Sequence, residues 1–113
     1  MTLPAPRPDR TCLVTGASSG IGAEMARQLA ARGHGVTLVA RNEAKLTSLA
    51  GELTSTHDIR AEVIVADLGD EGSRTALVAE VAHRSLAVNI LINNAGLTTM
   101  GPVHRSDPAA ELA

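Results

Sequence analysis

Short apolar runs alternate with segments of helical periodicity along the chain. Cys12-Leu13-Val14 is compact and apolar, as in a strand buried on both faces. The runs 36–40, 61–66 and 88–92 have the same character and predict three further strands. Apolar residues between the runs recur at spacings of three and four, which predicts a helix after each of the first three strands. Such alternation is typical of a parallel sheet, so we expect a doubly wound α/β fold.

The helical segments have recognisable ends and inward faces. The first spans about residues 20–32 and stops at Gly33. Asn42 can cap the second, and Asp107-Pro108 predicts the start of a further helix. The expected inward faces are Leu46, Leu49 and Leu53 in the second helix, and Leu77, Val78 and Val81 in the third.

The stretch from Thr15 to Gly22 lies between the first strand and the first helix and is rich in glycine. Gly16 can adopt the positive φ of a tight turn, Gly20 lets the backbone approach a ligand, and Gly22 lets the helix pack closely. The first N–H groups of a helix lack internal partners, and the helix dipole places partial positive charge there. The stretch therefore predicts a diphosphate site. The expected strand order is 3-2-1-4, with the ligand over the carboxyl ends of strands 1 and 4.

Composition narrows the functional classes. The 113 residues suffice for one domain, and they include no Phe, Tyr or Trp. The net charge of −2, without a basic cluster or an aromatic residue, argues against a nucleic-acid surface. The proline-rich residues 1–10 predict a disordered tail before a domain over 11–113. The chain has neither a signal-peptide core nor an apolar run of membrane-spanning length, which favours a cytoplasmic protein.

The lone cysteine and the scattered histidines suggest no chemistry of their own. Cys12 excludes an intrachain disulfide, and its place in an apolar run predicts a buried core role. The histidines show neither metal-ligand spacing nor a paired acid, so we expect surface positions for His34, His57, His83 and His104.

Three motifs resemble the short-chain dehydrogenase/reductase family and occur in that family's order. They are Thr15-Gly-Ala-Ser-Ser-Gly-Ile-Gly22, Asp67-Leu68 after the third strand, and Asn93-Asn-Ala-Gly96 after the fourth. The resemblance spans roughly residues 10–113 and corresponds to the cofactor-binding half of such an enzyme. It implies a Rossmann-like domain that is incomplete at its C-terminus and that belongs to an NAD(P)-dependent oxidoreductase.

The resemblance also implies which residues contact the cofactor. The diphosphate would be lined by Gly16, Ser18, Ser19, Gly20, Ile21 and Gly22. The adenine would be bordered by Asp67 and Leu68, and the adenine-side ribose by Asn93, Ala95 and Gly96.

Several of these residues have structural alternatives. Asp67 can accept hydrogen bonds from backbone N–H groups of its own turn, a role compatible with adenine contact. Asn93 or Asn94 can instead tie neighbouring strand ends together. Ser18 and Ser19 can act as turn formers, although we expect at least one of them to face the ligand.

The end of the second strand indicates which dinucleotide binds. An NAD site places a carboxylate about 20 residues after the glycines, whereas an NADP site places a cation there for the 2′-phosphate. Positions 36–42 hold no Asp or Glu, but Arg41 is present. A guanidinium can both fork onto a phosphate and stack on adenine, which favours NADP(H). In the alternative, Arg41 is a solvated loop charge and Glu43 helps to bind NAD.

The catalytic residues that the family resemblance implies are missing. The family uses a Ser, and a Tyr-x-x-x-Lys motif that supplies the proton donor, yet this chain has no Tyr and its only Lys is Lys45. By the resemblance these residues would lie beyond Ala113, so we name no catalytic residue.

Two functions remain open. One is the NADP(H)-binding portion of an oxidoreductase acting on a carbonyl or alcohol, and the other is a noncatalytic nucleotide-binding or interaction module. The free edge of the fourth strand predicts self-association or a complementing chain.

Overall fold

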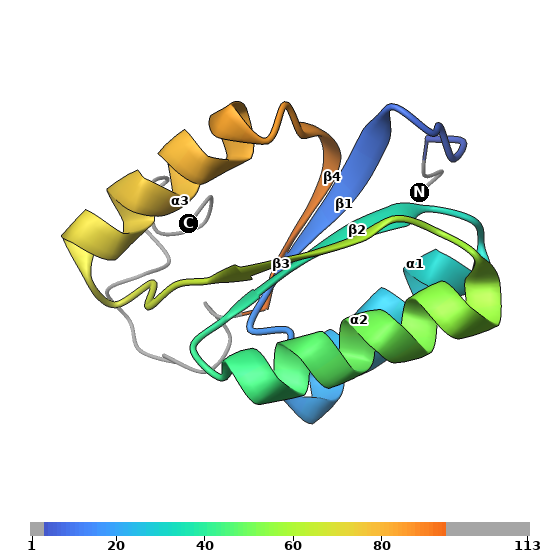
Figure 1. The fold of residues 1–113 in the computed structure, drawn as a ribbon, viewed down its shortest axis with the longest axis horizontal. Coiled ribbons are helices and arrows are strands. Elements are labelled where there is room, and N and C mark those ends of the chain that lie inside the picture. The colour runs from blue at the N-terminus through green and yellow to red at the C-terminus, as the bar shows by residue number, and fades with distance from the viewer. Residues whose placement is uncertain (1–3, 95–113) are drawn as a thin grey trace.

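A parallel sheet with the strand order β3-β2-β1-β4 forms the centre of the protein (Figure 1). The computed structural model describes residues 4–94. The strands are β1 (Arg10–Thr15), β2 (Gly35–Ala40), β3 (Ala61–Val65) and β4 (Ala87–Asn93), and the helices are α1 (Gly20–Ala31), α2 (Glu43–His57) and α3 (Glu71–His83). The predicted Rossmann-like class and the predicted strand order are both confirmed.

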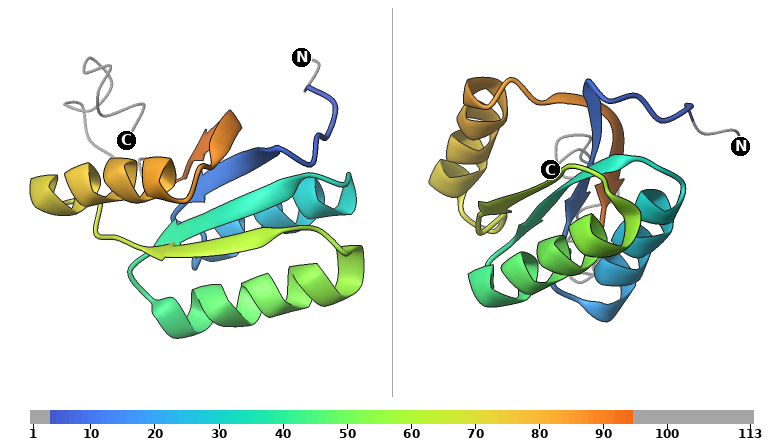
Figure 2. Two further views of the ribbon diagram at one scale, coloured as in Figure 1. Left: turned by 45° about the horizontal axis from the view of Figure 1, so that its top comes forward. Right: turned by 45° about the vertical axis from the view of Figure 1, so that its right-hand side comes forward.

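The two faces of the sheet carry different helices. Figure 2 shows α1 and α2 against one face and α3 against the other. Leu46, Leu49 and Leu53 of α2 are buried, as predicted, in a core that includes Val14 and Leu38 of the sheet. Cys12 is fully buried in the same core, and burial raises the pKa of its thiol to about 11, which fits the predicted core role.

Helix α3 is covered much less than its sequence pattern predicts. Leu77 and Val81 pack against Leu13, Val39 and neighbouring residues, but no residue of α3 is fully buried. The prediction that Val78 faces inward is wrong, because its side chain is 70% exposed. One-sided packing against the sheet buries only the narrow stripe at spacing four, and Val78 lies outside that stripe.

Each helix begins at a side chain that caps it. Asn42 accepts a hydrogen bond from the Lys45 N–H, as predicted, and Asp70 accepts one from the Ser73 N–H. Ser19 caps α1 by accepting from the Gly22 N–H. These caps place the starts of the helices beyond the carboxyl ends of the preceding strands.

His34 is only 4% exposed, so its predicted surface position is wrong. Gly33 adopts a φ of 93°, and the N–H groups of Gly33 and His34 donate to carbonyls of the last turn of α1. This helix end turns the chain directly into β2 and leaves His34 inside.

None of the helices within residues 4–94 is long and apolar enough to cross a membrane.

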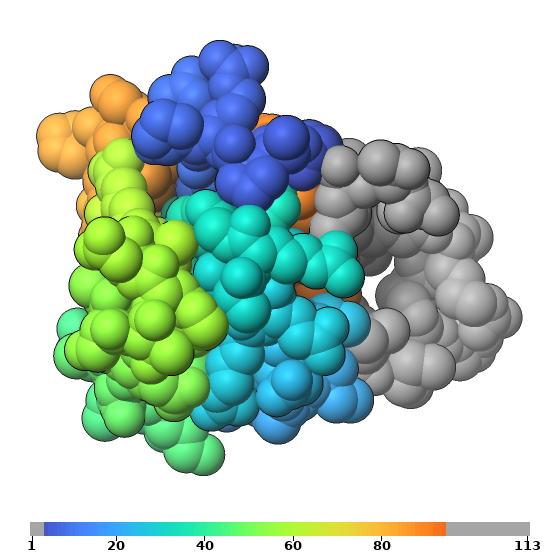
Figure 3. Space-filling view, turned by 90° about the vertical axis from the view of Figure 1, so that its right-hand side faces the viewer, coloured from blue at the N-terminus to red at the C-terminus, as the bar shows by residue number. Residues whose placement is uncertain are grey.

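The predicted domain limits stay a prediction. Arg10, placed in the predicted tail, is the first residue of β1. The residues before Arg10 lie at the amino end of the sheet. Figure 3 shows this end, with the N-terminal segment in dark blue. Pro6 lies close to Gly33 there, since a Cβ added to Gly33 would be 3.7 Å from the Pro6 ring.

Candidate dinucleotide site

The glycine-rich turn lies where the strand order reverses, beyond the carboxyl ends of β1 and β4. Gly16 has a φ of 64°, a left-handed conformation that favours glycine. Its carbonyl accepts from the Ser19 N–H at 3.1 Å and closes the turn. The Ala17 N–H donates to the Val39 carbonyl at 3.2 Å, which holds the turn beside the end of β2. In open α/β sheets this position is the usual ligand crevice.

The start of α1 presents free donors. Among residues 4–94, the N–H groups of Gly20 and Ile21 have no hydrogen-bond partner. A Cβ added to Gly20 would meet nothing within 4 Å, so the space beside this residue is open. Free N–H groups at the positive end of a helix, reached past a residue without a side chain, fit an anionic diphosphate.

The two serines of the turn differ. The Ser19 hydroxyl donates to the Gly16 carbonyl at 2.9 Å and accepts from the Gly22 N–H at 3.2 Å and the Asn94 side-chain amide at 2.8 Å. One donor and two acceptor positions are all that a hydroxyl offers. The Ser18 hydroxyl is half-buried and has no hydrogen-bond partner within residues 4–94.

Both asparagines at the end of β4 contact the neighbouring strand or its turn. The Thr15 hydroxyl donates to Asn93 Oδ1 at 3.0 Å. Asn94 is 1% exposed, and its Nδ2 donates to the Gly16 carbonyl at 3.1 Å as well as to Ser19. The strand-tying alternative is confirmed for Asn93, whereas Asn94 ties the end of β4 to the glycine turn. Ribose contact by Asn93 stays a prediction.

The turn role of Asp67 is also confirmed. Its Oδ1 accepts from the Gly69 N–H at 2.9 Å, while its own N–H donates to the Ser73 hydroxyl at 2.8 Å. Arg74 donates to the carbonyl of Leu68 at 2.8 Å. The Asp67 side chain is nevertheless exposed, which leaves it accessible to a ligand.

Arg41 follows β2 directly and is exposed. It makes no hydrogen bond or ion pair within the described residues. Several other arginines do form ion pairs, namely Arg7, Arg10, Arg27, Arg60 and Arg84. Arg41 is therefore an uncommitted cation near the glycine turn.

Ala95 and Gly96, which were predicted to contact the ribose, lie outside the described residues, as does His104.

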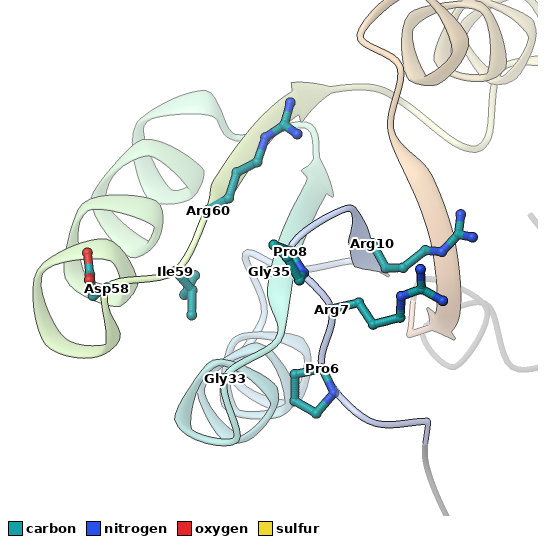
Figure 4. Close-up of a pocket in the computed structure, with 9 residues that line it drawn as sticks. All are labelled: Pro6, Arg7, Pro8, Arg10, Gly33, Gly35, Asp58, Ile59 and Arg60. Atoms are coloured by element: carbon teal, nitrogen blue, oxygen red, sulfur yellow. The ribbon is translucent and has the colours of Figure 1, made fainter.

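A hollow of about 270 Å³ lies at the other end of the sheet (Figure 4). Its lining includes Arg7, Arg10 and Arg60 beside Pro6 and Ile59. Arg7 and Arg10 both pair with Asp9, and Arg60 pairs with Glu62. This hollow lies at the opposite end of the sheet from the starts of the helices, so it does not fit the predicted dinucleotide site.

Sequence reasoning missed the distinct role of Asn94 and the full use of the Ser19 hydroxyl. The signal for Ser19 was its place immediately before the helix, where serine is a preferred cap. No local signal links Ser19 to Asn94, because their contact spans 75 residues.

Comparisons with known proteins agree with this geometry. A family model described as short chain dehydrogenase matches residues 10–112. A very-long-chain 3-oxoacyl-CoA reductase of Eremothecium gossypii is 42% identical over 91 residues, which are 80% of this chain and 26% of the relative. The chain thus spans about a quarter of the length of that relative.

Solved structures show the same likeness. A bulky-bulky ketone specific alcohol dehydrogenase from Comamonas testosteroni superposes with a TM-score of 0.70 at 36% identity, covering 92% of this chain and 41% of that one. A short-chain dehydrogenase from Sphingobium yanoikuyae, in complex with NADPH, has a TM-score of 0.68 at 38% identity, covering 91% and 41%.

Proposed function

Because the chain belongs to the short-chain dehydrogenase family, we propose that it is the NADP(H)-binding portion of an oxidoreductase. The observation that carries this proposal is the start of α1, where the N–H groups of Gly20 and Ile21 are free within the described residues beside open space. When bound, the nicotinamide would supply or accept a hydride. The residues of this chain bind and orient the dinucleotide.

The proposed contacts with the dinucleotide follow from which hydrogen-bond donors and acceptors of the site residues are still free within residues 4–94. The diphosphate lies against Gly16, Gly20, Ile21 and Gly22. Ser18, whose hydroxyl is unused within residues 4–94, is the serine that contacts it, whereas Ser19 has no donor or acceptor left. Asp67 and Leu68 border the adenine, and Asn93, Ala95 and Gly96 border the adenine-side ribose.

Arg41 supports NADP(H) over NAD(H). The bond from Ala17 to Val39 holds the glycine turn two residues before Arg41, so this cation lies at the adenosine side of the site. It has no competing carboxylate within the described residues. Glu43, the alternative partner for an NAD ribose, lies in the first turn of α2, where acidic residues are ordinary. The NADPH complex of the Sphingobium yanoikuyae relative supports the same choice.

Arg41→Ala tests the cofactor preference. A charged hydrogen-bonding contact contributes about 1.5–3 kcal/mol, so the variant should bind NADPH roughly ten- to a hundredfold more weakly. Its affinity for NADH should change little. Calorimetric titration measures both affinities, and the rise of Tm with each cofactor gives an independent check.

Arg32→Ala is the matched control. Arg32 is an exposed arginine at the opposite end of α1, so its removal changes the net charge equally without touching the site. Equal affinity of the unmodified chain for NADPH and NADH would overturn the role of Arg41.

The substrate class follows from the relatives and not from a residue of this chain. The names of two relatives specify a 3-oxoacyl-CoA reductase and a ketone specific alcohol dehydrogenase. We therefore infer a carbonyl or alcohol substrate for the whole protein. A cytoplasmic location stays a prediction.

A noncatalytic nucleotide-binding module is the second candidate for these 113 residues, which include no tyrosine. The only lysine, Lys45, is an exposed residue of α2. Without a positioned acid at the substrate oxygen, hydride transfer to a carbonyl is severely impaired. We expect the chain of 113 residues to bind NADPH without oxidising it in the presence of ketones. NADPH oxidation above the uncatalysed rate would exclude the noncatalytic module.

A further inference from the structure

The side chain of Asn94 lies inside the protein, directly behind the glycine turn. Its Nδ2 donates to the Gly16 carbonyl at 3.1 Å and to the Ser19 hydroxyl at 2.8 Å. A backbone carbonyl can only accept a hydrogen bond, so the nitrogen of the amide must be the atom that faces Gly16. The amide therefore connects the end of β4 to a turn that lies 75 to 78 residues earlier in the chain.

The hydroxyl of Ser19 is oriented by this amide. Its oxygen accepts from Asn94 Nδ2 and from the Gly22 N–H, so its single proton is directed to the Gly16 carbonyl. That carbonyl also accepts from the Ser19 N–H and from Asn94. Three donors on the protein side thus hold the Gly16 oxygen inward. A carbonyl oxygen turned toward the ligand would repel a diphosphate.

The Asn94 amide and the Gly16 carbonyl pack directly against the start of α1. A Cβ added to Gly22 would be 2.3 Å from the Gly16 oxygen and 2.8 Å from Asn94 Nδ2. Within residues 4–94, the buried Oδ1 of Asn94 has no hydrogen-bond partner, so no contact there replaces those of Nδ2. The turn thus depends on the two hydrogen bonds that Nδ2 donates.

We propose that Asn94 is a positioning residue of the dinucleotide site. It does not contact the cofactor. It fixes the Ser19 hydroxyl and the Gly16 carbonyl so that the first N–H groups of α1 remain available to the diphosphate. The proposal rests on the proposed function, because the dinucleotide is the ligand whose site Asn94 shapes.

Asn94→Asp tests this role, since a carboxylate of the same size cannot donate to the Gly16 carbonyl. We expect NADPH to bind at least about tenfold more weakly to the folded variant. Ser19→Ala should weaken NADPH binding similarly, and Ser19→Thr, which retains the hydroxyl, should restore it. Because both residues act through one hydroxyl, Ser19→Ala combined with Asn94→Asp should bind no more weakly than the weaker single variant.

Asn89→Asp is the matched control. It places a carboxylate within β4, at another asparagine whose Oδ1 is buried and has no hydrogen-bond partner in the part of the chain that the structure describes. We expect its NADPH affinity to match that of the unmodified chain. Amide hydrogen exchange adds a readout without cofactor, in which the Gly22 N–H exchanges faster in Asn94→Asp while the Leu49 N–H in α2 does not.

The outcomes separate the two proposals. If the unmodified chain binds no NADPH, the proposed function fails and the role of Asn94 fails with it. If the unmodified chain binds NADPH, and Asn94→Asp and Ser19→Ala bind it equally well with unchanged Gly22 exchange, the positioning role alone is overturned. Should Asn94→Asp not fold, the comparison of Ser19→Ala with Ser19→Thr decides in the same way. Equal loss of affinity in Asn89→Asp also contradicts the proposal, because it would show a general effect of charge in β4.

Discussion

The three glycines of the turn and of the first turn of α1 meet three different physical requirements. Gly16 adopts a φ of 64°, which strains any residue with a side chain. Gly22 has no space for a Cβ, because the Gly16 oxygen would lie 2.3 Å from it. Gly20 meets neither limit, since the space beside it is open and its φ is not positive. The fold alone therefore does not explain the glycine at position 20, whereas a ligand approaching the backbone does.

Gly20→Ala and Gly22→Ala should accordingly separate binding from stability. Alanine at position 20 lies in the first turn of α1, and it should leave stability unchanged or raise it by up to about 1 kcal/mol. NADPH should nevertheless bind at least about tenfold more weakly, because the methyl group occupies the approach of the diphosphate. Gly22→Ala should cost about 1–3 kcal/mol through overpacking. Urea unfolding and NADPH titration measure the two effects, and unchanged NADPH affinity in Gly20→Ala would place the diphosphate elsewhere.

The glycines of the site could be predicted from sequence, but the hydrogen bonds of its serines and asparagines could not. Glycine spacing is local, and it specifies the turn together with the helix that follows. One acceptor position of the Ser19 hydroxyl is taken by Asn94, which directly follows β4, so the availability of this hydroxyl depends on how β4 lies beside β1. Sequence left Ser18 and Ser19 equivalent, and the distances distinguish them.

At the scale of elements, the C-terminal end of α3 is attached to β3 by one side chain. Arg84 caps the helix and donates to Glu80, to Glu62 of β3 and to the Val63 carbonyl. Helix boundaries and caps follow from local patterns, which is why α2 was predicted well. The burial of a helix face depends on which elements pack against it, and this explains the wrong inward position of Val78.

Glu62→Gln should weaken the attachment of α3 in a pH-dependent way. Hydrogen bonds from Arg60, and then from Arg84, hold the pKa of the Glu62 carboxyl below its ordinary value of 4.5. Because the folded pKa is the lower one, the contribution to stability is complete above pH 4.5 and is lost as the pH falls through the folded pKa. The variant should cost roughly 1 kcal/mol at pH 7 and show a flatter decline in stability on acidification.

Urea unfolding across this pH range measures the effect. Glu52→Gln serves as control, because the hydrogen bond from Arg27 also lowers the pKa of Glu52 but the pair is exposed. Salt should screen the Glu52 pair more strongly than the Glu62 pair. An acid dependence in Glu62→Gln identical to that of the unmodified chain would show that Arg84 does not stabilise the protein through Glu62.

At the scale of the whole molecule, the alternation of strands and helices was sufficient to predict the sheet and its crevice. Each crossover is local, and the order 3-2-1-4 follows once the glycine turn marks the first strand. The strand that would pair with the other edge of β4 cannot be predicted in this way, because strand pairing across that edge is not encoded in any local pattern. The family relatives are longer, and this chain covers 26% of the Eremothecium gossypii reductase.

The outer edge of β4 should make the chain of 113 residues self-associate. Among the described strands, β4 pairs only with β1, and its residues 88–92 include neither a charged residue nor a proline that would oppose edge pairing. Val88 and Leu91 are each 39% exposed, so apolar surface accompanies the backbone groups of this edge.

Leu91→Lys should shift the chain toward monomer, because a lysine on an edge strand disfavours pairing with a second copy. Val78→Lys is the control, since Val78 is 70% exposed on α3, away from the edge, and should leave association unchanged. Sedimentation velocity over a range of concentrations measures the effect. A chain that remains monomeric at all concentrations and unfolds cooperatively without ligand would show that the edge of β4 does not drive association.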